Sequence, residues 1–201
     1  MKTCHVVGAG DFDPRLLKAE EGDLVIAADA GYAHLQKAGI ETDLYVGDGD
    51  SLGFTPSGPE MILLPKVKDD TDVHAAVKAG LERGFRRFSL YGVLGGKRFS
   101  HSLANLSVLI FLAEKDAEGV LIHPDYSVRL LPPGTFVFDG RGGYFSLFDF
   151  EGKASVSIRG AKYPLDHAAL PPALTLGASN EGTEKTEITV YTGRVFWIRE
   201  P

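Results

Sequence analysis

This 201-residue sequence has almost no cysteine and no long apolar run. It has a single cysteine, Cys4, which permits no internal disulfide and favours a reducing, cytoplasmic location. We expect Cys4 to be a buried thiol on a first strand. No apolar run approaches the roughly 20 residues that span a bilayer. The opening residues, MKTCHVVGAGDFD, predict that strand and not a signal peptide. We therefore expect no membrane partner.

An excess of basic residues is also missing. The chain has 27 acidic and 21 basic residues and a formal net charge of −6. Nucleic acids and anionic membranes attract positively charged surfaces. This balance therefore argues against a nucleic-acid partner.

Several familiar site motifs are absent as well. A phosphate-binding G-x-x-x-x-G-K-[ST] loop fails because Tyr91 and Arg98 occupy two of its required positions. The dinucleotide fingerprint fails because Asp13 stands where its third glycine belongs. An EF-hand loop starting at Asp48 would lack two of its oxygen ligands. No G-x-S-x-G turn or zinc-spaced His/Cys cluster occurs.

Strand-like and helix-like segments alternate over residues 1–125. This rhythm predicts a mostly parallel sheet with helices on both faces, that is, an α/β catalytic domain. The expected strands are 4–9, 24–29, 43–48, 61–65, 87–93 and 119–123, and the expected helices are 14–21, 31–39, 72–84 and 102–116.

Helical periodicity ends near residue 125. Short β-branched or aromatic segments separated by Gly and Pro follow, and they predict a small antiparallel β-sandwich domain over residues 126–201. Thr192-Gly193 has the form of a hairpin turn. No long linker separates the halves.

Two aspartates follow the strand at 43–48, in the stretch Gly47-Asp48-Gly49-Asp50-Ser51. Neighbouring carboxylates repel each other unless a positive charge lies between them. Residues two apart on a strand end can point to the same side, and Mg²⁺ prefers such oxygen ligands. The stretch is therefore either a solvated turn or a site for a hard cation.

More polar residues follow other strands. Asp29 ends the strand at 24–29, the glycine-rich segment 92–96 follows another, and Asp69, Asp70 and Asp72 begin the helix at 72–84. Parallel strands would bring them to one edge, where α/β proteins bind ligands. Helix capping by Asp69 or Asp70 explains one or two of these acids but not three.

The segment after residue 92 has two interpretations. Gly95 and Gly96, followed by Lys97 and Arg98, could cradle a phosphate at a helix start. Equally, they could form a strand-to-helix connection capped by Ser100. His101 and Asn105 share a helix face, and either could be a structural polar residue.

Taken in order, these segments resemble the bacterial thiamine pyrophosphokinase family. The resemblance rests on IAADAGYAHLQKAGIETDLYVGDGDS, LPKVKDDTDVHAAVKAG, YGVLGGKRFSHSLANL and GAKYPLDHAAL with TLGASNEG, and covers nearly the whole chain. It implies an α/β catalytic domain and a thiamine-binding β-sandwich. It also implies Mg²⁺-dependent transfer of a pyrophosphoryl group from ATP to the thiamine hydroxyl, giving thiamine diphosphate and AMP, and a homodimer with active sites at the subunit interface.

The resemblance also implies residue roles. Asp29, Asp48, Asp50 and Asp72 would be catalytic, and the last three would hold the metal. The residues implied for ATP are Asp69, Asp72, Gly95, Gly96, Lys97, Arg98, His101 and Asn105, and those implied for thiamine are Ser179 and Asn180.

The sequence departs from the family pattern at three places. Ala30 replaces a glycine of A-D-G-G, Gly49 replaces the phenylalanine of G-D-F-D-S, and Ser100 replaces the aspartate of a G-G-R-x-D-H segment that is one residue longer here. Two alternatives therefore stay open. One is a nucleotide-sugar glycosyltransferase that uses Asp48-x-Asp50, and the other is a catalytically weak or silent thiamine- or nucleotide-binding homologue.

Overall fold

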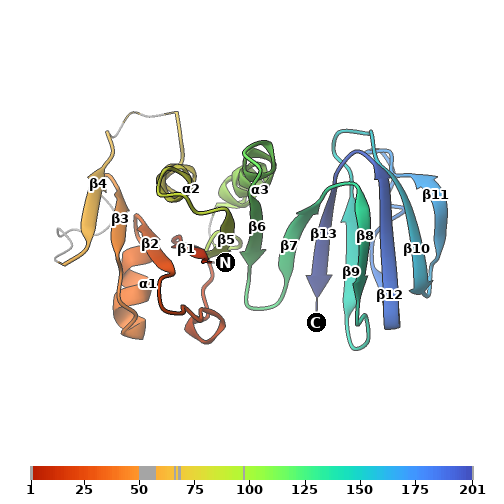
Figure 1. Ribbon diagram of the computed structural model, residues 1–201, viewed down its shortest axis with the longest axis horizontal. Coiled ribbons are helices and arrows are strands. Elements are labelled where there is room, and N and C mark those ends of the chain that lie inside the picture. The colour runs from red at the N-terminus through yellow and green to blue at the C-terminus, as the bar shows by residue number, and fades with distance from the viewer. Residues whose placement is uncertain (1, 50–57, 66, 68, 97, 201) are drawn as a thin grey trace. The chain divides into compact units, whose positions relative to one another are not determined.

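The computed structural model describes residues 2–49, 58–65, 67, 69–96 and 98–200. The chain divides into two compact units, Met1–Pro124 and Asp125–Pro201. Figure 1 shows helices among the strands of the first unit and mainly strands in the second.

The described part of the first unit contains a parallel sheet. Its strand order is β4-β3-β2-β1-β5-β6, and every neighbouring pair is parallel. The expected parallel sheet is thus confirmed, and the carboxyl ends of its strands share one edge. The order reverses between β1 and β5, a point at which open α/β sheets bind ligands. The strands are β1 (Cys4–Val7), β2 (Leu24–Ala28), β3 (Leu44–Gly47), β4 (Glu60–Leu63), β5 (Arg87–Tyr91) and β6 (Glu118–Ile122).

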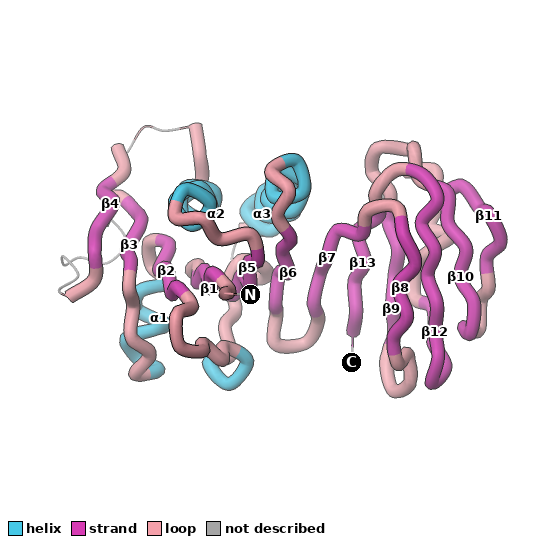
Figure 2. The backbone as a smooth tube through the Cα atoms, in the orientation of Figure 1, coloured by secondary structure: helices cyan, strands magenta, loops and turns pink. Residues whose placement is uncertain are grey.

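Helices cover both faces of this sheet (Figure 2). They are α1 (Gly31–Ala38), α2 (Asp72–Glu82) and α3 (Phe99–Glu114). From α1, Leu35 is buried in a cluster with Val7 and Tyr45. On α2, a β-carbon at Gly80 would lie 2.8 Å from Sγ of Cys4. Side chains alternate along β1, so Cys4 and Val7 point to opposite faces of the sheet.

The helix expected at 14–21 is wrong. Only a 3₁₀ turn, η1 (Pro14–Leu16), forms there. The Asp13 side chain caps it by accepting a hydrogen bond from the Arg15 N–H at 3.0 Å, and Leu17 is already extended. A proline and a capping acid are typical of a helix start, but here they begin only a single 3₁₀ turn.

The second unit is an antiparallel β-sandwich, as expected. Strands β7, β13 and β9 pair together, and β12 pairs with both β8 and β10, while β11 pairs with β10. Buried side chains, including Phe145, Ile188 and Trp197, form its core. The strands are β7 (Ser127–Leu131), β8 (Gly134–Phe138), β9 (Tyr144–Phe148), β10 (Ser155–Ala161), β11 (Leu165–Ala169), β12 (Asn180–Thr192) and β13 (Val195–Glu200).

The hairpin expected at Thr192-Gly193 is wrong. These residues do connect β12 to β13, and Gly193 has a φ of +68°. The strands they join have other partners, however: β12 pairs with β8, β9 and β10, whereas β13 pairs with β7 and β9. The two strands share β9 as a neighbour and do not pair with each other, a distinction that local sequence does not carry.

Candidate active site

Two acids stand at the carboxyl ends of neighbouring strands. Asp29 follows β2, and its N–H donates to the Val46 carbonyl at 2.9 Å. Its φ of +50° is a left-handed conformation that costs a non-glycine residue about 1 kcal/mol and occurs often at functional sites. Asp48 follows β3 and is half-buried. Backbone geometry thus fixes the position of Asp29 beside the end of β3.

The hydroxyl of Tyr45 lies at the strand ends, where the charges of several acids act on it. Burial raises the pKa of Tyr45 to about 12, and the negative charges of Asp29, Asp72 and Asp48 raise it as well, while a hydrogen bond from the Gly49 backbone lowers it. A phenol feels charges strongly only when they are close. The charges of acids from three separate segments therefore act on one side chain, and Asp29 is the acid whose carboxylate lies 3.5 Å from its hydroxyl. Asp50 lies outside the described residues.

The start of α2 separates its acids into different roles. Thr71 is the N-cap and accepts from the His74 N–H at 3.2 Å, so capping by Asp69 or Asp70 is wrong. Asp70 instead binds the Lys78 ammonium at 2.6 Å, and this hydrogen bond lowers the pKa of the Asp70 carboxyl. Asp69 is exposed. Asp72, in the first turn of α2, is the acid of this group whose negative charge raises the pKa of Tyr45.

Glycines let two loops meet above β1 and β5. The Gly8 N–H donates to the Tyr91 carbonyl at 2.8 Å, and the Gly10 N–H donates to the Gly92 carbonyl at 2.6 Å. A β-carbon on Gly10 would lie 2.8 Å from the Gly92 oxygen. Close backbone packing therefore explains Gly8 and Gly10, which occupy the first two glycine positions of the fingerprint that Asp13 breaks.

The loop containing Gly95 and Gly96 is held by polar groups from elsewhere in the chain. Both glycines have positive φ, +71° and +74°. The Gly96 N–H donates to the Asp11 carboxylate at 3.3 Å, and Nε2 of His123 lies 3.4 Å from the same oxygen. Buried Asn105 donates its amide N–H to the Val93 carbonyl at 2.6 Å. In this structure Asn105 thus supports the loop backbone.

The first turn of α3 presents two of the residues expected to contact ATP. Helix α3 begins at Phe99 with Arg98 as N-cap, so capping by Ser100 is wrong. Nη2 of Arg98 lies 3.4 Å from Nδ1 of His101, and both side chains are exposed. Lys97 lies outside the described residues.

The residues expected to contact thiamine belong to the second unit. Asn180 is buried, accepts from the Tyr163 N–H at 3.0 Å and donates to the Tyr163 carbonyl at 2.7 Å. Ser179 is exposed, has a φ of +52°, and donates its N–H to Oγ of Ser146 at 2.9 Å. Asn180 therefore shapes the loop, and Ser179 presents its side chain to solvent.

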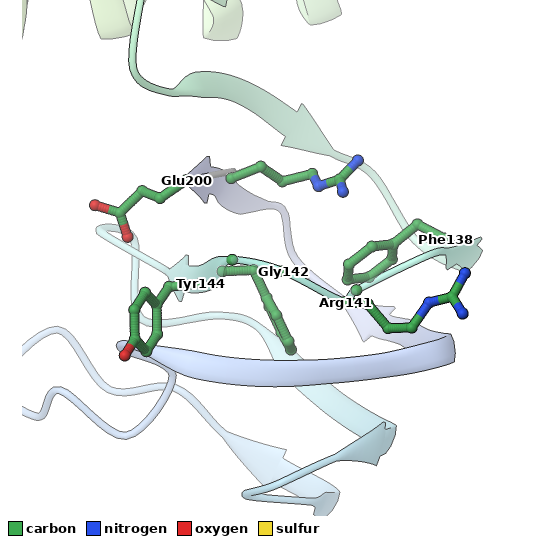
Figure 3. A pocket seen from close by; sticks show the side chains of 9 residues that line it. Phe138, Arg141, Gly142, Tyr144 and Glu200 are labelled. Atoms are coloured by element: carbon green, nitrogen blue, oxygen red, sulfur yellow. The ribbon is translucent and has the colours of Figure 1, made fainter.

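A small cavity of about 110 Å³ also lies in the second unit, between the β8–β9 turn and the end of β13 (Figure 3). Arg141 binds the Asp139 carboxylate at 2.7 Å and lowers the pKa of Asp139 to about 2. Arg199 stacks 4.9 Å from the Phe138 ring centroid. Both arginines are thus engaged by protein groups, and ligand pockets are usually several times larger. We assign no ligand to it.

The acids at the strand ends of the first unit have the donor atoms that a hard cation prefers. Asp29, Asp48 and Asp72 offer only oxygen atoms, as Mg²⁺ prefers, and their combined field favours positive charge. Within the described ranges, no group of three or more Asp, Glu, His or Cys side chains is close enough to hold a metal ion.

Sequence reasoning missed Tyr45, Asp11 and His123. The contact between Asp11 and Gly96 spans 85 residues, so no local pattern predicts it. The sequence carries only a weak signal for Tyr45: the hydroxyl of a tyrosine on a buried strand needs a polar partner.

Fold and site together define a two-domain protein, with an α/β unit that carries acids at its strand ends, followed by a β-sandwich. The model of the family described as "Thiamin pyrophosphokinase, catalytic domain" matches residues 16–121, and that of "Thiamin pyrophosphokinase, vitamin B1 binding domain" matches residues 137–195. The chain belongs to the thiamine pyrophosphokinase family.

Solved structures agree. Thiamine pyrophosphokinase from Bacillus subtilis is 26% identical, with a TM-score of 0.84 and 99% of each chain covered. The protein from Geobacillus thermodenitrificans is also 26% identical, with a TM-score of 0.81 over 99% of this chain and 97% of that one. The Candida albicans enzyme shares the fold at 16% identity, with a TM-score of 0.76 over 98% and 89%. No functionally curated protein matches the sequence.

The activity follows from the family: the chain is an enzyme that pyrophosphorylates thiamine. These comparisons give no support to a glycosyltransferase or to a silent binding protein. Among the described residues, no helix is both long enough and apolar enough to cross a membrane.

Proposed function

We propose that the chain transfers the pyrophosphoryl group of ATP to the thiamine hydroxyl with Mg²⁺, releasing AMP. The observation that carries this proposal is that Asp29 and Asp48 stand at neighbouring strand ends and that their charges, with that of Asp72, all raise the pKa of Tyr45. Asp48, Asp50 and Asp72 would hold the metal. A bound Mg²⁺ neutralises charge on phosphate oxygens during transfer.

The protein's own groups would orient the reactants. Asp29 would accept a hydrogen bond or the proton from the thiamine hydroxyl, which makes that oxygen a better nucleophile. The acids would also attract the positively charged thiazolium ring. Placement of the acceptor oxygen in line with the phosphorus is the main contribution an enzyme makes to such a transfer.

The glycine-rich loop would bind the phosphates. Gly96 leaves room for a close approach of a phosphate oxygen, whereas the Asp11 carboxylate occupies the space beside Gly95 and would have to give way there. Cationic side chains beside the loop would complement the phosphate charge. For this role we propose Lys97, Arg98 and His101, with Asn105 supporting the loop and Asp69 near the nucleotide.

For thiamine, we propose contacts with Ser179 and Asn180. The exposed Ser179 side chain supports this assignment. Since family members work as homodimers with active sites between subunits, we propose the same assembly here. We also propose a cytoplasmic location, because a single cysteine permits no internal disulfide, as is usual for proteins of a reducing compartment. Cys4 itself is buried, and burial raises the pKa of its thiol, as suits a structural residue.

Removal of divalent metal should abolish activity. With excess EDTA, we expect less than about 1% of the thiamine diphosphate formed with Mg²⁺, since the ion supplies several kcal/mol of transition-state stabilisation. Added Mg²⁺ should restore the rate. Product is measured by chromatography, and a circular dichroism spectrum in EDTA controls for unfolding. Undiminished turnover in EDTA would rule out the metal role of the acids.

A further inference from the structure

Tyr45 connects the hydrophobic core of the first unit to the acids at its edge. The residue is fully buried, and its ring packs edge-on against Tyr32 with centroids 6.1 Å apart. It belongs to the cluster that includes Leu35 and Ala27. The ring is therefore held by packing, and the hydroxyl at its far end reaches the carboxyl edge of the sheet.

The hydroxyl bridges two strand ends. It donates to Oδ1 of Asp29, after β2, at 3.5 Å, and a hydrogen bond from the backbone of Gly49, after β3, lowers the pKa of the hydroxyl. Gly49 separates the two aspartates of the Asp48-Gly49-Asp50 stretch and has a φ of +75°. The hydroxyl thus binds the acid of one segment and is influenced by the backbone that follows Asp48 in the other.

Gly47 makes room for this bridge. A β-carbon at Gly47 would lie 2.7 Å from the Tyr45 hydroxyl oxygen and 3.1 Å from Cα of Asp29. Gly47 is a strand residue and is not among the glycines with positive φ, so its backbone conformation does not demand glycine. Space for the Tyr45 hydroxyl is the reason for a glycine here.

A tyrosine suits the electrostatics of this place. Carboxylates that converge repel each other, so they need groups that hold them in place. A lysine or arginine would hold them but would also neutralise the field that attracts a cation. A neutral phenol donates a hydrogen bond and leaves the negative charge for the ligand.

We propose that Tyr45 is a positioning residue for the pyrophosphoryl transfer: its hydroxyl fixes Asp29 relative to the Asp48-Gly49 segment that follows β3. The inference rests on the role proposed above for these acids. It adds that the Tyr45 hydroxyl sets the distance between Asp29 and the segment that contains Asp48.

The test compares two variants that each lose one hydroxyl from the same hydrophobic cluster. Tyr45→Phe removes the bridge and keeps the ring. Tyr91→Phe is the matched control, because the Tyr91 hydroxyl lies 3.4 Å from Nδ1 of His5 and its side chain is equally buried in the cluster. We expect kcat to fall about tenfold or more in Tyr45→Phe, as for loss of a hydrogen bond to a charged group, and to change less than about twofold in Tyr91→Phe.

A second readout does not depend on activity. Hydrogen exchange of the Gly49 amide, followed by NMR with ¹⁵N-glycine labelling, should be about tenfold faster in Tyr45→Phe than in Tyr91→Phe, because its acceptor is gone. Equal exchange and equal kcat in the two variants would overturn the proposal.

Gly47→Ala approaches the same bridge from the other side and keeps the test open if Tyr45→Phe folds poorly. As a single variant, Gly47→Ala should lower kcat. When it is combined with Tyr45→Phe, it should lower kcat by a smaller factor, since the clash with the hydroxyl is then absent. Full activity of Gly47→Ala would contradict the bridge. If Asp48→Asn is inactive while Tyr45→Phe is normal, only this inference fails; if Asp48→Asn is normal, the proposed acid site fails.

Discussion

We expect Asp48→Asn to lower kcat for thiamine diphosphate formation by about a hundredfold or more while the protein stays folded. The change keeps the size of the side chain and removes its charge, and with it a proposed metal ligand. Asp48 lies just beyond the end of β3 and is half-buried, so the loss of charge leaves the sheet intact. Initial rates at saturating thiamine and ATP give kcat, and thermal unfolding reports the fold.

Asp50→Asn should behave in the same way, because the two carboxylates are proposed to hold one ion. Asp116→Asn is the matched control: it removes an exposed acid with a φ of +52°, which asparagine tolerates. We expect this control to keep its full rate. Near-normal activity in both Asp48→Asn and Asp50→Asn would mean that the stretch is only a turn.

Gly31→Ala should destabilise the protein by about 3 kcal/mol or more and abolish most activity. A β-carbon at Gly31 would lie 1.9 Å from the carbonyl oxygen of Val7, a backbone atom of the central strand β1. Helix α1 would have to move away from the sheet, and Asp29, two residues earlier, would move with it. Urea unfolding and activity assays measure the two effects.

The adjacent position supplies the control. Ala30→Gly restores a glycine of the family's A-D-G-G segment, and Ala30 is the N-cap of α1, where glycine is well tolerated. We expect a change in stability below about 1 kcal/mol. If Gly31→Ala is as mild as Ala30→Gly, close packing of α1 against β1 does not fix the position of Asp29.

Local patterns predicted the fold where one pattern implied one arrangement. Apolar strands alternating with amphipathic helices predicted the parallel sheet and its helices, because only a sheet covered on both faces buries such strands. The pattern failed at residues 14–21, where a proline and acids suit one 3₁₀ turn as well as a helix. It failed again at Thr192-Gly193, where the partners of each strand depend on the whole sandwich. The exposed edge strand β11 lacks apolar alternation and was not predicted.

The candidate site was predictable to the same extent. Asp29, Asp48 and the acids before α2 could be assigned to one edge because parallel strands end together. The separate roles of Asp70 and Asp72 could not, since they depend on which one reaches Lys78. The role of Tyr45 could not be predicted either, because its hydroxyl lies at the carboxyl edge of the sheet while its Cα lies within β3.

The products of the reaction test the central claim most directly. Enzyme, thiamine, ATP and Mg²⁺ are mixed, and adenine nucleotides and thiamine esters are quantified together over the first turnovers. Pyrophosphoryl transfer predicts AMP and thiamine diphosphate in equal amounts, with no thiamine monophosphate accumulating. ADP formed together with thiamine monophosphate would contradict the account.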